Sequence, residues 1–246
     1  TDAGVDYVAA AQRILEEVEN AERQAAGEYQ EPKGELVLSA PTMFGRQHVL
    51  PVVTDFLARY PQIRVRLLLS DRNADLVGDH IDLAVRIGTL PDSGMVATRL
   101  GEMRIVTCAH PALLEKHGIP ERPRELAALP IIRIESPMPY RGWRFNAEEA
   151  EDRLVALQPV LSLTTPESAA DAARLGAGVA RLLHYQAIDG LACGELTLFL
   201  QAMEPEPAPV HLLYTSRDLA PLKLRKFIDF AAPALRQALL RIAAAV

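Results

Sequence analysis

Residues 36–69 read LVLSAPTMFGRQHVLPVVTDFLARYPQIRVRLLL and contain three consecutive elements of regular structure. The apolar run 36–40 predicts a short strand, which Pro41 ends. Between residues 44 and 60 the apolar side chains recur every three or four positions, which is typical of an amphipathic helix. Residues 65–69 predict a second strand. Together they predict a βαβ unit with parallel strands.

The same alternation of strands and helices continues to the C-terminus. A strand–helix–strand–helix–strand order occurs before residue 104 and again after residue 130, which predicts two α/β subdomains rather than one long sheet. A crevice between two such lobes, at the carboxyl ends of the strands, is where small ligands usually bind. The other predicted strands span 83–87, 104–109, 131–134, 160–163, 179–183, 196–200 and 210–214, and the other predicted helices span 75–78, 111–116, 166–175, 185–191 and 222–244.

The composition is that of an ordinary globular protein. The chain has 246 residues, a net charge of −6 and a hydrophobic fraction of 49%. No run approaches the roughly 18 apolar residues that a membrane helix needs. The acidic balance argues against a basic surface that grips nucleic acid. Two cysteines, Cys108 and Cys193, form no disulfide framework or zinc motif and fit a reducing, cytosolic setting.

The first 31 residues differ from the rest in charge and in pattern. They contain eight acidic and two basic residues, and the remainder of the chain is balanced. An amphipathic helix that lies on its own domain would explain this segment, but its spacing favours a helix that pairs with another helix. The apolar positions that form the heptad seam are Tyr7, Ala11, Ile14, Val18, Ala21 and Ala25.

The sequence contains no common catalytic or nucleotide-binding motif. It lacks the P-loop, the G-x-G-x-x-G fingerprint, H-E-x-x-H and G-x-S-x-G. Its six histidines are scattered, with no pair at helical metal-binding spacing. Asp79 and Asp82 bracket a turn without an evident partner for paired-carboxylate chemistry. We therefore expect no catalytic residue, no metal site and no cofactor.

Two junctions between a strand and a helix are candidate anion sites. In residues 39–45, Thr42 is placed to cap the following helix, whose first backbone N–H groups would attract a carboxylate or phosphate. In residues 164–168, Pro166 suits the first helical position, and Thr164 with Glu167 has the spacing of a capping box. Ordinary capping without a ligand remains the alternative at both junctions.

From Pro32 to about Arg241 the chain resembles the effector-binding region of LysR-type transcriptional regulators. The most characteristic segment is IDLAVRIG at residues 81–88. The resemblance also rests, in the expected order, on residues 34–41, on Leu50-Pro51 through Val65, on Leu90–Ser93, on Leu100-Gly101, on Gly142–Phe145 and on Ala177–Leu183.

The resemblance implies two Rossmann-like subdomains of the type-2 periplasmic-binding-protein architecture, preceded by a long linker helix. The linker and dimerisation helix would span 1–31, subdomain I would span 32–107 plus 210–246, and subdomain II would span 108–209. It implies a small effector in the crevice and a cytoplasmic homodimer or homotetramer with no membrane attachment. It also implies that DNA is read only by an N-terminal winged helix-turn-helix domain, which is absent from this chain.

The resemblance further implies where the effector binds. Arg86 or Arg133 would supply positive charge for an anionic ligand, although Arg86 has an alternative role as an ion pair that holds its strand. His184 departs from the small polar residue that is frequent in the family, and would narrow the site or make binding pH-dependent. The implied ligand-binding residues are Pro41, Thr42, Met43, Phe44, Arg86, Ile87, Gly88, Arg133, Thr165, Pro166, His184 and Tyr185.

Two other functions stay open. A solute-binding protein of the same fold is disfavoured by the heptad seam and by the lack of a leader sequence. A small-molecule transferase would need convergent catalytic side chains, which the sequence does not show.

Overall fold

The structure is a computed structural model, which describes residues 31–72, 75–90, 94–135, 142–215 and 220–245. In the first 30 residues it also describes Thr1, Gly4, Tyr7, Val8, Ala11, Leu15 and Val18. The predicted linker helix at 1–31 therefore lies, apart from these positions and Glu31, outside the described residues.

Packing divides the chain into two compact units. Unit 1 comprises Thr1–Arg86, Pro91–Thr98 and His211–Leu235, and unit 2 comprises Ile87–Leu90, Arg99–Val210 and Arg236–Val246. Strand β4 (Val96–Met103), strand β12 (Ala208–Tyr214) and helix α8 (Leu222–Ala244) contribute residues to both. The subdomain ranges proposed from the sequence remain a prediction.

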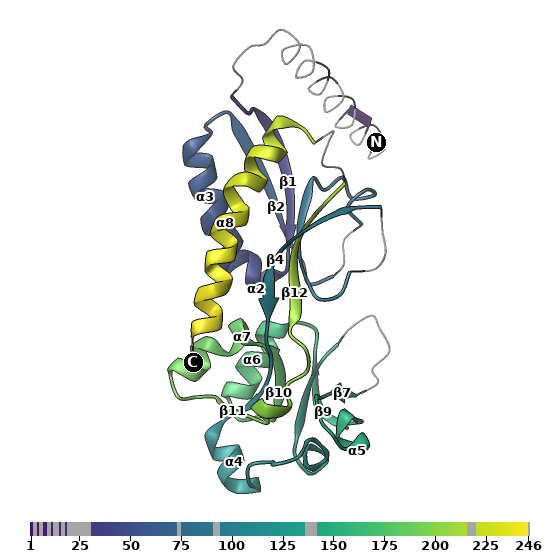
Figure 1. Ribbon diagram of the computed structural model, residues 1–246, viewed down its shortest axis with the longest axis vertical. Helices are drawn as coiled ribbons and strands as arrows, with labels where there is room; N and C mark the ends of the chain where they lie inside the picture. The colour runs from purple at the N-terminus through teal and green to yellow at the C-terminus, as the bar shows by residue number, and fades with distance from the viewer. Residues whose placement is uncertain are drawn as a thin grey trace. The chain divides into compact units, whose positions relative to one another are not determined.

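Unit 1 is built on a sheet whose strand order is β2-β1-β3-β12-β4. Its first strands, β1 (Gly34–Ala40), β2 (Ile63–Leu69) and β3 (Leu83–Ile87), pair in parallel, as the strand–helix–strand pattern predicts. Between β1 and β2 the chain is helical, and helix α3 (Leu50–Arg59) lies beside α8 (Figure 1). Phe56 of α3 contacts two aromatic rings of α8, at centroid distances of 5.0 Å from Phe227 and 5.5 Å from Phe230.

The helical segment after β1 begins close to the sheet. It starts as α2 (Thr42–Phe44), widens into a π-helical turn at Gly45–Val49, and continues as α3. A side chain at Gly45 would collide with Leu69 of β2 and lie 3.1 Å from the Cβ atom of Ala40. The helix therefore passes close to the ends of both strands at Gly45, and a larger residue there would require the Leu69 side chain to move.

Unit 2 contains antiparallel as well as parallel pairs, which departs from the mostly parallel sheet that we expected. Strand β5 (Ile105–Ala109) lies between β10 (Ala180–Leu183) and β11 (Thr197–Phe199) and is antiparallel to both. Strands β6 (Ile131–Ile134) and β9 (Pro159–Leu163) pair in parallel. The remaining elements are α4 (Pro111–His117), a 3-10 helix (Pro123–Ala128), β7 (Trp143–Arg144), α5 (Ala150–Arg153), β8 (Leu154–Val155), α6 (Pro166–Arg174), α7 (His184–Ala192) and a 3-10 helix (Gln201–Met203).

Unit 2 buries two apolar clusters. One contains Trp143 and Phe145 with the apolar side chains of α4. The other lies around β5, α6 and β10 and includes three alanines of α6, Ala169, Ala170 and Ala173. These small side chains let α6 pack closely on the strands, so the start of α6 is held in a fixed place.

Before residue 104 the structure differs from the predicted elements at two places. Residues 75–78 form no helix, because the segment up to residue 80 is a series of turns. No strand was predicted between residues 88 and 103, where β4 lies. Strand β4 reads VATRLGEM, and only Leu100 and Met103 are buried, so it lacks the apolar run that identified the other strands.

Candidate functional site

In unit 1 the first predicted junction places a helix start at the carboxyl end of β1. The residue before the helix is Pro41, which provides no side-chain cap, and Thr42 is already helical. The prediction that the Thr42 side chain caps this helix is therefore wrong. Instead, the Thr42 backbone N–H donates to Oδ1 of Asp71 at 3.1 Å. A carboxylate from the segment after β2 therefore accepts from the first N–H of the helix.

Arg86 lies at the end of β3 in the same unit. Its Nη1 donates to the backbone carbonyl of Arg72 at 3.5 Å. The side chain is half-buried, and burial lowers the pKa of its guanidinium from the ordinary value. A guanidinium that is held away from water gains more than an exposed one from an anionic ligand, because it has less hydration to lose.

The other predicted residues near these strand ends contribute mainly to packing. The side chains of Met43 and Phe44 are buried, and the Phe44 ring lies 4.9 Å from the His48 ring. Gly88 has φ of +115° and donates its N–H to Pro209 at 2.8 Å. Nothing lies within 4 Å of a Cβ atom added to Gly88, so the backbone conformation rather than space requires glycine there.

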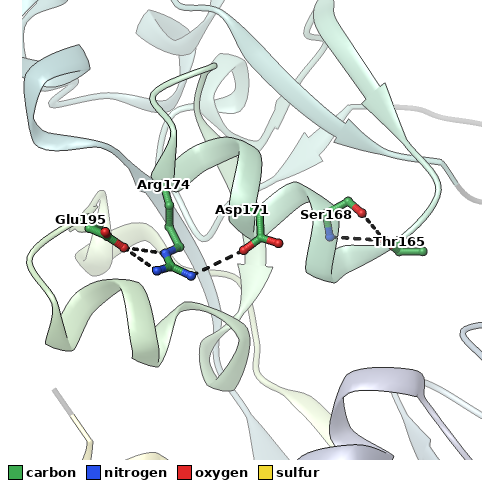
Figure 2. A network of polar contacts seen from close by, with 5 residues as sticks. All are labelled: Thr165, Ser168, Asp171, Arg174 and Glu195. Atoms are coloured by element: carbon green, nitrogen blue, oxygen red, sulfur yellow. Dashed lines mark hydrogen bonds and ion pairs between the residues drawn. The ribbon is translucent and has the colours of Figure 1, made fainter.

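In unit 2 the second predicted junction is a capped helix start. Thr165 is the N-cap of α6: its Oγ1 accepts from the Ser168 N–H at 3.2 Å and donates to the Ser168 hydroxyl at 2.8 Å (Figure 2). Pro166 occupies the first turn, as predicted. The predicted capping box is wrong by one residue, since Thr165 rather than Thr164 caps the helix. The Thr165 hydroxyl is used by its own helix.

Figure 2 also shows how the other end of α6 is held. The Arg174 guanidinium donates to Glu195 at 2.6 Å, from the segment after α7, and reaches Asp171 at 3.5 Å. The hydrogen bond to Glu195 raises the pKa of Arg174 from its ordinary value. These groups are partly exposed, so the contacts orient α6 more than they stabilise the fold.

The remaining predicted residues of unit 2 lie on two elements. Arg133 of β6 is 3.8 Å from the Glu135 carboxylate, which reduces the charge that it offers to a ligand. His184 and Tyr185 begin α7, and both side chains are buried. The Tyr185 hydroxyl accepts from Nε2 of Gln186 at 3.2 Å. That these residues bind a ligand stays a prediction.

Unit 2 also contains a cavity of about 700 Å³ that no predicted residue lines. Asp152 in its wall is buried and accepts from the Arg124 N–H at 2.9 Å. Arg153 donates to the backbone carbonyls of Ala147 and Glu148. These hydrogen bonds connect the walls of the cavity. The lining residues come from separate segments and share no sequence motif that would have predicted the cavity. They are Glu121, Arg122, Asn146, Ala147, Glu148, Glu149, Asp152, Arg153, Ala202 and Met203.

The described part of the chain offers neither a cluster of metal-binding side chains nor a membrane-spanning helix. Within the described ranges, no group of three or more His, Cys, Asp or Glu side chains is placed to hold a metal ion. None of the helices that the structure describes is long and apolar enough to span a membrane.

Comparison with known proteins identifies the family. The model of the LysR substrate binding domain matches residues 29–236. The HTH-type transcriptional activator AaeR of Escherichia coli K12 is 29% identical over 229 residues, which cover 93% of this chain and 74% of that protein. A probable HTH-type transcriptional regulator, LtrA of Klebsiella pneumoniae, is 32% identical and covers 94% of this chain and 75% of its own length.

Solved structures agree in fold. The LysR-type regulator CrgA of Neisseria meningitidis is 28% identical, matches 96% of this chain and 80% of its own, and superposes with a TM-score of 0.74. The virulence activator AphB of Vibrio cholerae, at 24% identity and a TM-score of 0.73, has the same fold. The predicted α/β class with the periplasmic-binding-protein-like fold is thereby confirmed. This chain belongs to the LysR substrate-binding-domain family, and it is the effector-binding region of a LysR-type transcriptional regulator.

Proposed function

We propose that the chain binds a small anionic metabolite and that Arg86 is the residue that holds its negative charge. The observation that carries the proposal is the half-buried guanidinium at the end of β3, which donates to the Arg72 carbonyl in the segment after β2. Charge-assisted hydrogen bonds from such a group to a carboxylate are among the stronger polar contacts in proteins. Arg133 of β6, whose guanidinium lies 3.8 Å from the Glu135 carboxylate, is the second candidate.

We infer that effector binding controls transcription through a homodimer or homotetramer. The relatives carry names of HTH-type regulators, so DNA would be bound by a helix-turn-helix domain and the protein would act in the cytoplasm with its target genes. The first 31 residues would join the subunits, because their apolar positions repeat in heptads.

Other functional classes are less well supported. The relatives named above are transcriptional regulators, which disfavours a solute-binding protein and an enzyme alike. Among the described residues that the sequence singled out, no set of side chains has the arrangement of a catalytic site.

Calorimetric titration of the 246-residue chain with acetate, benzoate, succinate and phosphate tests the proposal. Wild-type protein should bind at least one of these anions, and R86Q should bind it roughly tenfold or more weakly. R66Q is the matched control, because Arg66 is an exposed arginine of strand β2 in the same sheet. Equal binding by R86Q and wild type would place the anion elsewhere.

A further inference from the structure

We propose that the cavity of unit 2 is a second binding site, which takes an extended aliphatic amine with two or more ammonium groups. Its volume of about 700 Å³ is within the range of small-molecule sites in proteins. Every residue that lines it belongs to unit 2, whereas Arg86 belongs to unit 1. The inference therefore goes beyond the proposed anion site and does not depend on it.

The lining of the cavity carries an excess of negative charge. Four carboxylates and two guanidiniums line it, and both guanidiniums are already engaged. Arg122 lies 3.9 Å from the Glu149 carboxylate. Arg153 donates to two backbone carbonyls of the wall, at 3.0 and 2.9 Å. The charge that remains available to a ligand is therefore negative, which favours a cation.

A buried carboxylate distinguishes this cavity from an exposed acidic surface. Asp152 is only 2% exposed and lies in the cavity wall. Its Oδ1 accepts from the Arg124 N–H at 2.9 Å, but no described residue donates to its Oδ2. A carboxylate oxygen that is withdrawn from bulk water gains free energy from a donor, and most from a charged one. An ammonium group in the cavity would supply that donor.

The carboxylates of the lining are separated rather than gathered at one point. Glu121, Glu148 and Asp152 form no ion pair with another described residue. These three do not converge on one ion either, since within the described ranges no group of three acidic, His or Cys side chains could hold a metal. An extended ligand with two ammonium groups can reach separate carboxylates. Its methylene groups would lie against the apolar parts of the lining, Ala147 and Met203.

Backbone hydrogen bonds hold the walls of the cavity in place. The Asn146 N–H donates to the Met203 carbonyl at 3.0 Å, which joins the segment after β7 to the 3-10 helix at Gln201–Met203. The Asp152 N–H donates to the Glu149 carbonyl at 3.1 Å, which fixes the start of α5. A site whose walls are already ordered loses less entropy when it binds a ligand.

Calorimetric titration of the whole chain with putrescine, at constant ionic strength near the physiological value, tests the inference. Salt at this level screens non-specific attraction between exposed charges. Wild type is compared with D152N, E148Q, E115Q and R86Q. D152N removes the charge but keeps an oxygen that can accept from the Arg124 N–H. E115Q is the matched control, because it removes the same charge from an exposed position on α4 that does not line the cavity.

Wild type should bind putrescine with a Kd below about 1 mM. D152N should bind it roughly tenfold or more weakly, because a charge-assisted hydrogen bond to a buried group is lost. E148Q, which changes an exposed carboxylate, should bind it roughly threefold more weakly. E115Q and R86Q should bind it as wild type does. Two other cations, Mg²⁺ with the same charge in a compact ion and butylamine with a single ammonium group, should each bind wild type roughly tenfold or more weakly than putrescine does.

The inference would be overturned if wild type did not bind putrescine saturably. It would also be overturned if D152N and E115Q weakened binding equally, or if Mg²⁺ bound as tightly as putrescine, because either result would indicate general attraction to an acidic protein. Circular dichroism checks that each variant is folded, and if D152N is not, the difference between E148Q and E115Q decides. Weaker putrescine binding by R86Q would place the amine outside this cavity, whereas loss of anion binding by R86Q concerns only the proposed function.

Discussion

Asp82 joins the turn before β3 to the neighbouring strand through two hydrogen bonds. Its Oδ2 accepts from the Val37 N–H at 2.7 Å, and its own N–H donates to the Val37 carbonyl at 2.9 Å. Val37 is buried, and its hydrogen bond to the Asp82 carboxylate is partly buried. This carboxylate, which the sequence singled out beside Asp79, has a structural role in the sheet.

Replacing Asp82 with alanine should lower the free energy of unfolding by about 1.5–3 kcal/mol, because a buried N–H would lose an ionised acceptor. Urea denaturation followed by circular dichroism measures the change. D55A, at an exposed helical position, should stay within about 0.5 kcal/mol of wild type. An unchanged urea midpoint for D82A would show that the bond contributes nothing to stability.

The two cysteines differ sharply in environment. Cys108 is buried and Cys193 is exposed, and burial raises the pKa of the Cys108 thiol to about 12. At pH 8 only the exposed thiol should react with Ellman's reagent in the native chain, and both should react in denaturant. C193S should remove the native reaction, whereas C108S should leave it intact. Two reactive thiols in the native protein would contradict the packing around β5.

The same shift predicts how stability depends on pH. In the unfolded chain the thiol of Cys108 ionises near its ordinary pKa, whereas in the folded chain it stays protonated up to about pH 12. The unfolded state therefore binds fewer protons above its own pKa, and stability falls as pH rises. The contribution of Cys108 to the free energy of unfolding should decrease by about 1–2 kcal/mol between pH 8 and pH 10. Between pH 8 and pH 10 the free energy of unfolding of C108S should decrease less than that of wild type, by this same amount. The same pH dependence of stability in the two proteins would contradict the prediction.

Among the elements, helix α8 has the bounds that its sequence predicts, Leu222–Ala244, although Pro233 lies inside it. Pro233 is exposed, so the missing N–H faces solvent and the buried face, with Leu235 and Leu239, remains regular. Proline tolerated on the outer face of a helix still costs free energy, because one hydrogen bond to the carbonyl four residues earlier is lost.

P233A should therefore raise the free energy of unfolding by about 1–3 kcal/mol and increase Tm. Q237A, another exposed position on the same helix, serves as the control and should change stability by about 0.5 kcal/mol or less. A lower Tm for P233A would mean that the bend at this proline is needed for packing of the helix.

Prediction from sequence succeeded where proline and glycine delimit the elements. Strand β3 and strand β6 have the predicted bounds, and α6 ends one residue earlier than expected. It failed where tertiary contacts supply the stabilisation: β4 has few buried side chains of its own, and strand direction in unit 2 follows from how distant segments meet. The π-helical turn at Gly45–Val49 was also not predicted from the sequence.

At the scale of the whole molecule, the family resemblance identified the fold, but not the partners of the predicted site residues. The contact of Thr42 with Asp71 depends on the register of β1 and β2 over seven paired residues. The cap of α6 depends on which threonine is the last extended residue. Single positions of this kind are decided by backbone geometry, so sequence reasoning located the two strand–helix junctions but not the hydrogen-bond partners within them.

The oligomeric state is the property of the whole molecule that the exposed apolar residues predict. Near the N-terminus, Tyr7, Val8, Leu15 and Val18 are exposed by 76%, 53%, 64% and 49%, an unusual share of apolar surface for so short a segment. Sedimentation of the chain should give at least twice the 26.9 kDa mass of a monomer. L15E and V18E should each weaken association roughly tenfold or more, because each places a charge in an apolar interface.

L240E is the control for these two variants: it changes an equally exposed leucine of α8 and should leave association unchanged. A monomeric wild type, or equal weakening by L240E, would show that these N-terminal residues do not join subunits.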